Sequence, residues 1–288
     1  MLLAINANNT NVKFGLFDGE RMVGDWRLRT DSRRTADEYL VWLTQLMTLA
    51  GIDRHVVKES IIATVVPQAL FHLEMLCHKH LATKPLIVGA PGVKLGIKVL
   101  IERPNEVGAD RLANAVGGHL VCPGPLVIVD FGTATTFDVV DGEGNYCGGV
   151  ISPGINLSIE ALHGATAMLP RIAVAAPPQV IGTNTLSAMQ SGIYWGYVGL
   201  IEGLVARIRK EFGKPLKVIA TGGLAPLFVN ATPVISRLEP EITMRGLVEI
   251  HRRNKITGGK NPGGRNTGTG GKNPAGHKPS GRSKPKAK

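Results

Sequence analysis

The same local pattern occurs twice in this chain, with polar turns that begin 124 residues apart, at Asn6 and Asp130. In each copy a short apolar run leads into the polar turn, a second apolar run follows, and an Asp-Gly pair ends the unit. Apolar runs bounded by turn residues predict β-strands, and Asp-Gly is typical of a hairpin. The first turn is predicted at 6–11 and the second at 130–136. The chain is therefore predicted to be duplicated.

The remaining segments alternate between strand and helix patterns. Thr35, followed by Glu38, has the spacing of a capping box that opens a helix. Further strands are predicted at 60–66, 86–88 and 217–220, and helices at 35–47, 70–81, 108–120, 155–163, 186–212 and from 224 onward. This alternation predicts an α/β chain of two domains, 1–115 and 116–257, that face each other across a cleft.

Residues 258–288 differ in composition from the rest of the chain. They hold six Lys, two Arg and no acidic residue, so the net charge of +11 falls to +3 for residues 1–257. Of these 31 residues 13 are Gly or Pro, and no aliphatic residue is larger than Ala. Such a segment cannot bury enough surface to offset its ordering entropy, which predicts a disordered tail. Because the tail also lacks aromatic residues that could stack on bases, we expect no specific nucleic-acid binding.

Membrane and disulfide-rich classes are excluded by the sequence pattern. No apolar stretch approaches the ~18 residues of a membrane span. The opening residues 1–5 lack the basic lead of a signal peptide. The cysteines Cys77, Cys122 and Cys147 are odd in number and form no C-x-x-C pair, which argues against a disulfide framework or a zinc ribbon. We therefore expect a protein of the reducing cytoplasm.

The polar turns carry residue types that suit phosphate binding. Asp130, Gly132 and Thr133 combine a carboxylate, a residue that allows close approach, and a hydroxyl. Clustered N–H groups and hydroxyls bind phosphate oxygens, and a carboxylate suits a cation or its waters. For either turn alone, a plain hairpin with a hydrogen-bonded side chain is an equal alternative. The pairing of the turns, with Thr221-Gly222-Gly223 after a later strand, favours a nucleotide held between two domains.

Six motifs in the same order resemble those of the type III pantothenate kinase family. They are residues 6–13, Gly108-Ala109-Asp110-Arg111, and residues 130–136, 149–154, 184–192 and 221–223, and they span about residues 1–254. The resemblance implies two actin-like (RNase H-like) domains, as in the acetate and sugar kinase superfamily. It also implies a cytoplasmic homodimer that phosphorylates pantothenate with ATP to 4′-phosphopantothenate, at the start of coenzyme A biosynthesis. The family uses a divalent metal, usually magnesium, and a monovalent cation, potassium or ammonium.

The resemblance further implies a role for each matching residue. ATP would be bound by Thr133 and by the first turn and its outgoing strand, namely Asn6, Ala7, Asn8, Asn9, Thr10, Asn11, Val12 and Lys13. Pantothenate would be bound by Gly108, Ala109, Asp110, Arg111 and Thr185, with Asp110 as the catalytic proton acceptor. Asp130 would bind the monovalent cation. Without the surrounding motifs, Asp110 and Arg111 are more simply an ion pair on a helix surface, and Lys13 is as readily a solvated strand residue.

The first turn departs from the family pattern. Where the family has Asp-x-Gly-Asn-Thr, this chain has Asn6-Ala7-Asn8-Asn9-Thr10. Asn6 keeps the shape of Asp and loses the charge expected to hold the waters of the metal. Asn8 adopts a left-handed backbone less readily than Gly does.

Two other functions compete with the kinase prediction. Asn6 and the basic tail would fit a non-catalytic family homologue that acts as an accessory regulator. Asp110, Asp130 and Thr185 argue for the enzyme, because a regulator has no evident need of all three. A sugar or acetate kinase of the same superfamily is less favoured, because residues 108–111 and 184–192 resemble the pantothenate branch.

Overall fold

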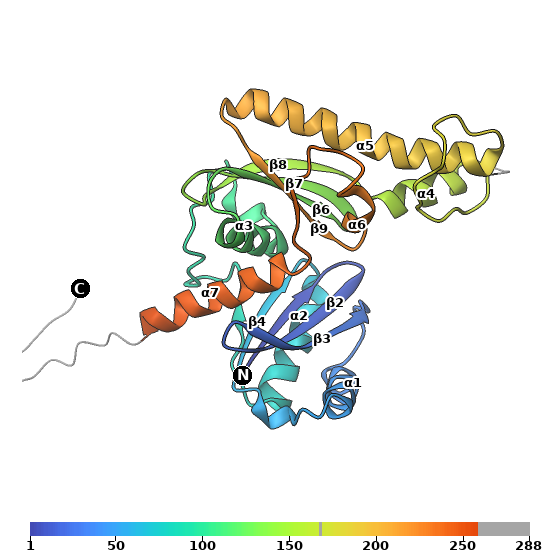
Figure 1. Ribbon diagram of the computed structural model, residues 1–288. Helices are drawn as coiled ribbons and strands as arrows, with labels where there is room; N and C mark the ends of the chain where they lie inside the picture. Colours follow the sequence, from blue (N-terminus) through green and yellow to red (C-terminus); the bar gives the residue numbers. More distant parts are fainter. Residues whose placement is uncertain (167–168, 259–288) are drawn as a thin grey trace, which may run out of the picture.

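Two five-stranded sheets form the framework of the protein (Figure 1). The computed structural model describes residues 1–166 and 169–258. The predicted tail therefore lies outside the described residues, except for Gly258, which ends a helix.

The first sheet is built from the N-terminal copy of the repeat. Its strand order is β3-β2-β1-β4-β5. The central strand β1 pairs antiparallel with β2 and parallel with β4. The strands are β1 (Leu2–Ala7), β2 (Asn11–Asp18), β3 (Arg21–Arg29), β4 (Glu59–Thr64) and β5 (Leu86–Ile87).

The second sheet repeats this arrangement. Read from its β8 edge, its order is β8-β7-β6-β9-β10, and the central strand β6 pairs antiparallel with β7 and parallel with β9. The strands are β6 (Leu126–Phe131), β7 (Ala134–Val140), β8 (Tyr146–Pro153), β9 (Lys217–Gly222) and β10 (Arg237–Leu238). The predicted duplication is confirmed, because both sheets share one order and one set of strand directions.

Both polar turns are shorter than predicted. Asn6 pairs in register with Lys13 on β2, and Asp130 pairs with Thr136 on β7. These polar residues therefore belong to the strands, because the ladder hydrogen bonds continue beyond the last apolar residue. The first turn is reduced to residues 8–10 and the second to Gly132 and Thr133.

Helices cover the outer face of each sheet. The first sheet is covered by α1 (Ala36–Leu49) and α2 (Pro67–Met75), the second by α4 (Ile155–Gly164), α5 (Thr185–Phe212) and α6 (Ala225–Phe228). The predicted capping box opens α1: the Thr35 hydroxyl accepts the N–H of Glu38 at 3.3 Å, and the Thr35 N–H donates to the Glu38 carboxylate at 2.7 Å. The short elements are the 3₁₀ turns Arg54–Val56 and Pro104–Glu106 and the π-helical turn Leu76–His80.

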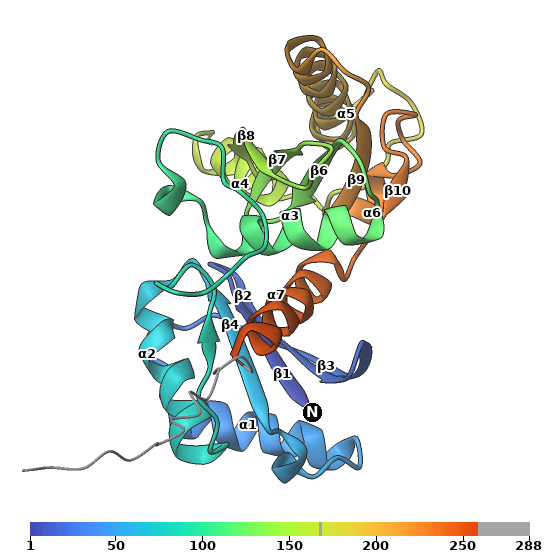
Figure 2. The ribbon, with the colours of Figure 1, turned by 90° about the vertical axis from the view of Figure 1, so that its left-hand side faces the viewer.

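Two helices, α3 (Ala109–Val121) and α7 (Ile242–Gly258), lie between the sheets (Figure 2). α3 and α7 share one apolar cluster with the first sheet, and α3 also packs with residues of the second. The two helices cross almost backbone to backbone. A Cβ added at Gly246 would overlap the carbonyl oxygen of Ala113, and one at Gly117 would overlap that of Ile242.

The division of the chain into domains stays a prediction. The proposed boundary between residues 115 and 116 lies within α3. In addition, α7 belongs to the predicted second domain, yet Met244, Leu247 and Ile250 pack against the first sheet.

We expect Gly246→Ala to lower the free energy of unfolding by about 2 kcal/mol, because the added methyl group overpacks the helix crossing by more than the gain in helix propensity. Urea denaturation measures this change. Gly199→Ala on α5 is the matched control, since a Cβ there meets no atom within 4 Å. Equal unfolding midpoints for the two variants would contradict close packing at Gly246.

Candidate active site

The two polar turns meet across the molecule. The hydroxyl of Thr10 in the first turn lies 2.7 Å from the hydroxyl of Thr133 in the second. Both side chains are exposed or partly exposed, so this hydrogen bond lies at the edge of a solvent-accessible space. The structure therefore brings together two of the residues that the sequence predicted for ATP.

The first turn is fixed by a residue that sequence reasoning missed. Thr30, directly after β3, donates its N–H to Thr10 O at 2.9 Å and its hydroxyl to Asn8 O at 2.6 Å. Within the turn, the Asn8 N–H donates to Asn11 O at 3.0 Å. The turn is therefore held by the residue that follows β3, and a single Thr after this strand of alternating charged and apolar residues gave no signal of it in the sequence.

Two side-chain oxygens in the first turn have unused hydrogen-bonding capacity. Oδ1 of Asn6 and Oδ1 of Asn8 are buried and accept no hydrogen bond from the described residues. Buried polar atoms are normally paired, so these oxygens are suited to an additional partner. Carboxamide oxygens are hard, neutral donors that suit Mg²⁺ or its coordinated waters.

Lys13 is not a solvated strand residue. Its ammonium group lies 2.5 Å from the Glu241 carboxylate, just before α7, and 3.6 Å from that of Asp25 on β3. The Lys13 side chain is only 14% exposed. Its charge is thus largely neutralised by carboxylates in this structure.

Asp130 is the last residue but one of β6 and lies beside a close backbone approach. Asn114 on α3 donates to Asp130 Oδ2 at 2.9 Å, and Thr243 on α7 donates to Asn114 Oδ1 at 2.6 Å. Gly222 has φ +93°, and a Cβ there would lie 2.6 Å from Asp130 Oδ1. The positive φ and the lack of space for a Cβ both restrict position 222 to Gly. Burial raises the pKa of Asp130 to about 6, the Asn114 hydrogen bond opposes the rise, and the charge of Asp110 adds to it.

Asp110 and Arg111 lie in the first turn of α3, and Gly108 is the residue before the helix. The Asp110 carboxylate accepts the backbone N–H of Arg111 at 2.8 Å. Burial raises the pKa of Asp110 above its usual range, although this N–H and the Arg111 charge act against the rise. A Cβ at Gly108 would lie 2.6 Å from Asp110 Oδ1, so Gly leaves the space that the carboxylate occupies.

The Asp110–Arg111 ion pair on a helix surface is not observed. The Arg111 guanidinium instead pairs with Asp138 on β7, with N···O distances of 2.7 Å. Sequence reasoning missed Asp138, although a carboxylate within the apolar run 137–140 was a possible signal. It also missed Asn114, which donates to Asp130 from α3, and Thr243 on α7, which donates to Asn114.

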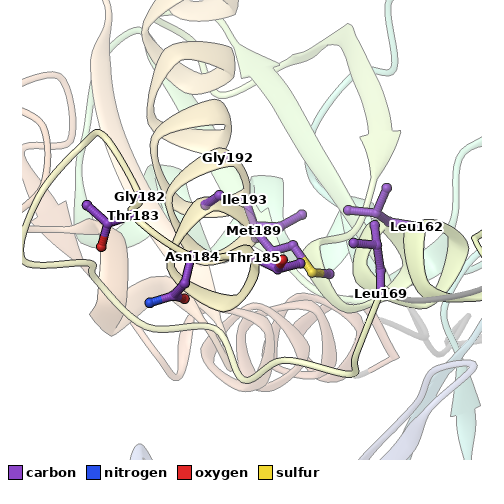
Figure 3. Close-up of a pocket in the computed structure, with 10 residues that line it drawn as sticks. Leu162, Leu169, Gly182, Thr183, Asn184, Thr185, Met189, Gly192 and Ile193 are labelled. Carbon is purple, nitrogen blue, oxygen red and sulfur yellow. The ribbon is translucent and has the colours of Figure 1, made fainter.

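Thr185 lies elsewhere, at the first position of α5 (Figure 3). It lines an open hollow of about 740 Å³ between α4, the loop before α5, and α5 itself. The described residues that line this hollow are Leu162, Leu169, Gly182, Thr183, Asn184, Thr185, Ala188, Met189, Gly192 and Ile193. They include no residue of the polar turns or of 108–111, so this hollow is separate from the site around Asp110.

The described residues contain neither a cluster of metal-binding side chains nor a membrane-spanning helix. No group of three or more His, Cys, Asp or Glu side chains is placed to hold a metal ion in residues 1–166 and 169–258. In the same ranges, no helix is both long enough and apolar enough to cross a membrane.

Two sheets of one topology, with the turns after their central strands facing each other, define an actin-like fold. The family model described as type III pantothenate kinase matches residues 2–207. A type III pantothenate kinase from Paramagnetospirillum magneticum is 61% identical over 254 residues, which are 88% of this chain and 98% of that protein. The chain belongs to the type III pantothenate kinase family.

Solved structures of lower identity share the fold. One from Campylobacter jejuni, assigned to the Baf family of transcriptional activators, has a TM-score of 0.55 at 19% identity and covers 88% of this chain and 99% of its own. The activator of 2-hydroxyisocaproyl-CoA dehydratase from Clostridium difficile, with bound ADPNP, has a TM-score of 0.53 at 10% identity and covers 89% and 96%.

We expect Asp130→Asn to stabilise the protein at pH 8 and to raise Tm by about 3 °C. The pKa of about 6 in the folded protein lies above the usual Asp value of 3.8, so the fold disfavours the ionised carboxylate. The wild type therefore loses stability as the pH rises from about 4 to 6, and the penalty is complete above that window. The Asn variant lacks this penalty.

Thermal unfolding at pH 8 and pH 4.5 checks this, with Asp18→Asn at an exposed hairpin position as control. A Tm gain that is equal at both pH values would show that burial of the charge is not its cause.

Proposed function

We propose that the protein is a pantothenate kinase, which transfers the γ-phosphoryl group of ATP to the primary alcohol of pantothenate as the first step of coenzyme A biosynthesis. The observation that carries this is the family relationship, with 61% identity to a type III pantothenate kinase across 88% of the chain. The meeting of the two turns at Thr10 and Thr133 supports it, because phosphoryl transfer depends on positioning and on charge neutralisation.

ATP phosphates would bind at the facing turns. The hydroxyls of Thr10 and Thr133 and the backbone N–H groups of Asn9 and Thr10 would supply donors. Residues 6–13 include no acidic side chain that would repel the triphosphate. Lys13 would contribute positive charge to the extent that a phosphate competes with Glu241 for its ammonium group.

The oxygen atoms of the site indicate which residues would bind the cations. The unpaired Oδ1 atoms of Asn6 and Asn8 would hold the waters of a magnesium ion, which neutralises phosphate charge when it is bound with ATP. Asp130 would bind the monovalent cation, potassium or ammonium, because it is the carboxylate that lies just before the second turn.

Asp110 would be the catalytic proton acceptor. Burial raises the pKa of its carboxylate, which makes it a better base than an exposed Asp. The pantothenate hydroxyl oxygen forms a bond to the γ-phosphorus, the bond from that phosphorus to the bridging oxygen breaks, ADP leaves, and the hydroxyl proton passes to Asp110. Arg111 would bind the pantothenate carboxylate.

We also propose a cytoplasmic homodimer. Apolar side chains are exposed around the hollow that contains Thr185: Leu157 at 50%, Leu162 at 37%, Val180 at 63%, Ile181 at 81% and Leu186 at 48%. An apolar patch rimmed by polar residues is typical of an interface between subunits. The three free thiols, Cys77, Cys122 and Cys147, suit a reducing compartment.

We expect Asp110→Asn to reduce kcat by about 10²–10⁴-fold, with ATP binding retained, because Asn cannot accept the proton. A coupled assay of ADP release with pantothenate measures kcat, and calorimetry measures ATP binding. Glu106→Gln is the control, since this nearby carboxylate is 65% exposed. A kcat near that of the wild type in Asp110→Asn would remove Asp110 from the role of base.

We expect Asn6→Asp to lower the magnesium concentration for half-maximal rate about tenfold, corresponding to ~1.4 kcal/mol, because a carboxylate holds the waters of the metal better than a carboxamide does. Asn6 is only 6% exposed, so the uncompensated charge should also lower Tm in the absence of magnesium. The measurement is a magnesium titration at saturating ATP and pantothenate.

Asn9→Asp is the matched control, because it adds the same charge to the same turn at an exposed position. Superimposable titrations of Asn6→Asp and wild type would place Asn6 outside the surroundings of the metal. A wild type without activity, together with an active Asn6→Asp variant, would favour the non-catalytic regulator.

A further inference from the structure

A buried carboxylate lies behind the substrate motif. Asp138 Oδ1 accepts hydrogen bonds from Nε of Arg111 at 2.7 Å and from the Tyr146 hydroxyl at 3.0 Å, and Arg111 Nη2 also lies at 2.7 Å. Thr136 donates to Asp138 Oδ2 at 3.4 Å. The Asp138 side chain is 0% exposed, whereas that of Arg111 is 16% exposed. The anion is therefore internal, and its cationic partner reaches the surface of the site.

The guanidinium group of Arg111 is fixed in place by further contacts. Its Cζ lies 5.7 Å from the centre of the Tyr146 ring. On the neighbouring strand β8, a Cβ at Gly149 would lie 3.0 Å from Nη2, so Gly gives this group room. The contacts with Asp138 use Nε and Nη2, and Nη1 donates no hydrogen bond to the described residues. Arg111 therefore has donors free for a planar anion such as a carboxylate.

The ion pair between Arg111 and Asp138 also keeps the guanidinium of Arg111 from pairing with the carboxylate of its neighbour Asp110. Arg111 follows Asp110 directly in α3, and a guanidinium paired with the Asp110 carboxylate would make that carboxylate a weaker base. Asp138 gives the guanidinium another partner, and the Asp110 carboxylate accepts the backbone N–H of Arg111 at 2.8 Å without pairing with its guanidinium. The two neighbours can thus act separately, one as base and one as anion-binding group.

We propose that Asp138, with Tyr146, is a positioning residue that holds Arg111 ready for the carboxylate of the substrate and away from Asp110. This inference rests on the proposed binding of pantothenate by Arg111. Asp138 itself does not touch the substrate, since its carboxylate is fully buried behind the guanidinium.

The test is a double-mutant cycle with Asp138→Asn, Arg111→Gln and the combined variant. We expect Asp138→Asn to raise KM for pantothenate about tenfold while kcat changes less than about threefold and KM for ATP is unchanged. The combined variant should match Arg111→Gln alone, because Asp138 acts through Arg111. Multiplicative effects of the two substitutions, or equal increases in both KM values for Asp138→Asn, would overturn the proposal.

Tyr146→Phe gives the same test without an unpaired charge, should Asp138→Asn fail to fold. It removes one hydrogen bond to Asp138 and should raise KM for pantothenate about threefold, again only when Arg111 is present. Tyr197→Phe is the matched control, because its hydroxyl is likewise hydrogen-bonded, to Pro153 O at 2.9 Å, on the other side of the sheet. Equal effects of the two Tyr variants would overturn the positioning role.

The cycle also separates this inference from the assignment on which it rests. If Arg111→Gln leaves KM for pantothenate unchanged while the enzyme still phosphorylates pantothenate, the role of Arg111 is wrong and Asp138 has no substrate to position. If Arg111→Gln raises KM and Asp138→Asn does not, Arg111 binds the substrate without help from Asp138. A wild type that does not phosphorylate pantothenate would overturn the proposed function itself.

Discussion

The backbone contact between α3 and α7 determines how closely the two sheets approach. Each sheet has its own outer core, but their inner faces share these two helices. Gly117 and Gly246 allow the helices to cross where any side chain would overlap a carbonyl group. The turn after β1 and the turn after β6 can then reach one another, as the Thr10–Thr133 hydrogen bond shows. The geometry of the site thus depends on a contact that contains no catalytic residue.

The two copies of the repeat have diverged in charge. Asp130 lies just before the second turn, and burial raises its pKa and that of Asp138; the charge of Asp110 adds to the rise at Asp130, and that of Asp130 adds to the rise at Asp138. Asn114 and Arg111 partly compensate for this concentration of negative charge. The first turn has only neutral oxygens, those of Asn6 and Asn8. Phosphates near the first turn therefore meet little repulsion, at the cost of weaker attraction for a cation.

Much of the fold could be predicted, because strands, hairpins and caps are encoded by residues close in the chain. The capping box of Thr35 and the duplicated order of the strands are examples. The lengths of the turns could not, since Asn6 and Asp130 extend their strands through pairing with Lys13 and Thr136. Candidate site residues could be predicted where a motif is contiguous in the chain. Asp138 and Thr243 escaped because their contacts with Arg111 and Asn114 join residues 27 and 129 positions apart.

By itself the sequence determined that the chain is a duplicated α/β protein and which short motifs are candidates for its chemistry, because residue periodicity and turn composition act over a few residues. Tertiary structure decided which of those motifs share a site. It placed Thr10 against Thr133, turned Arg111 away from Asp110 toward Asp138, and put Thr185 in a separate hollow. These placements depend on how the helices and sheets pack. In the packed protein, the burial and pairing of charges decide which residues are in contact, and residues that are neighbours in the chain need not be partners.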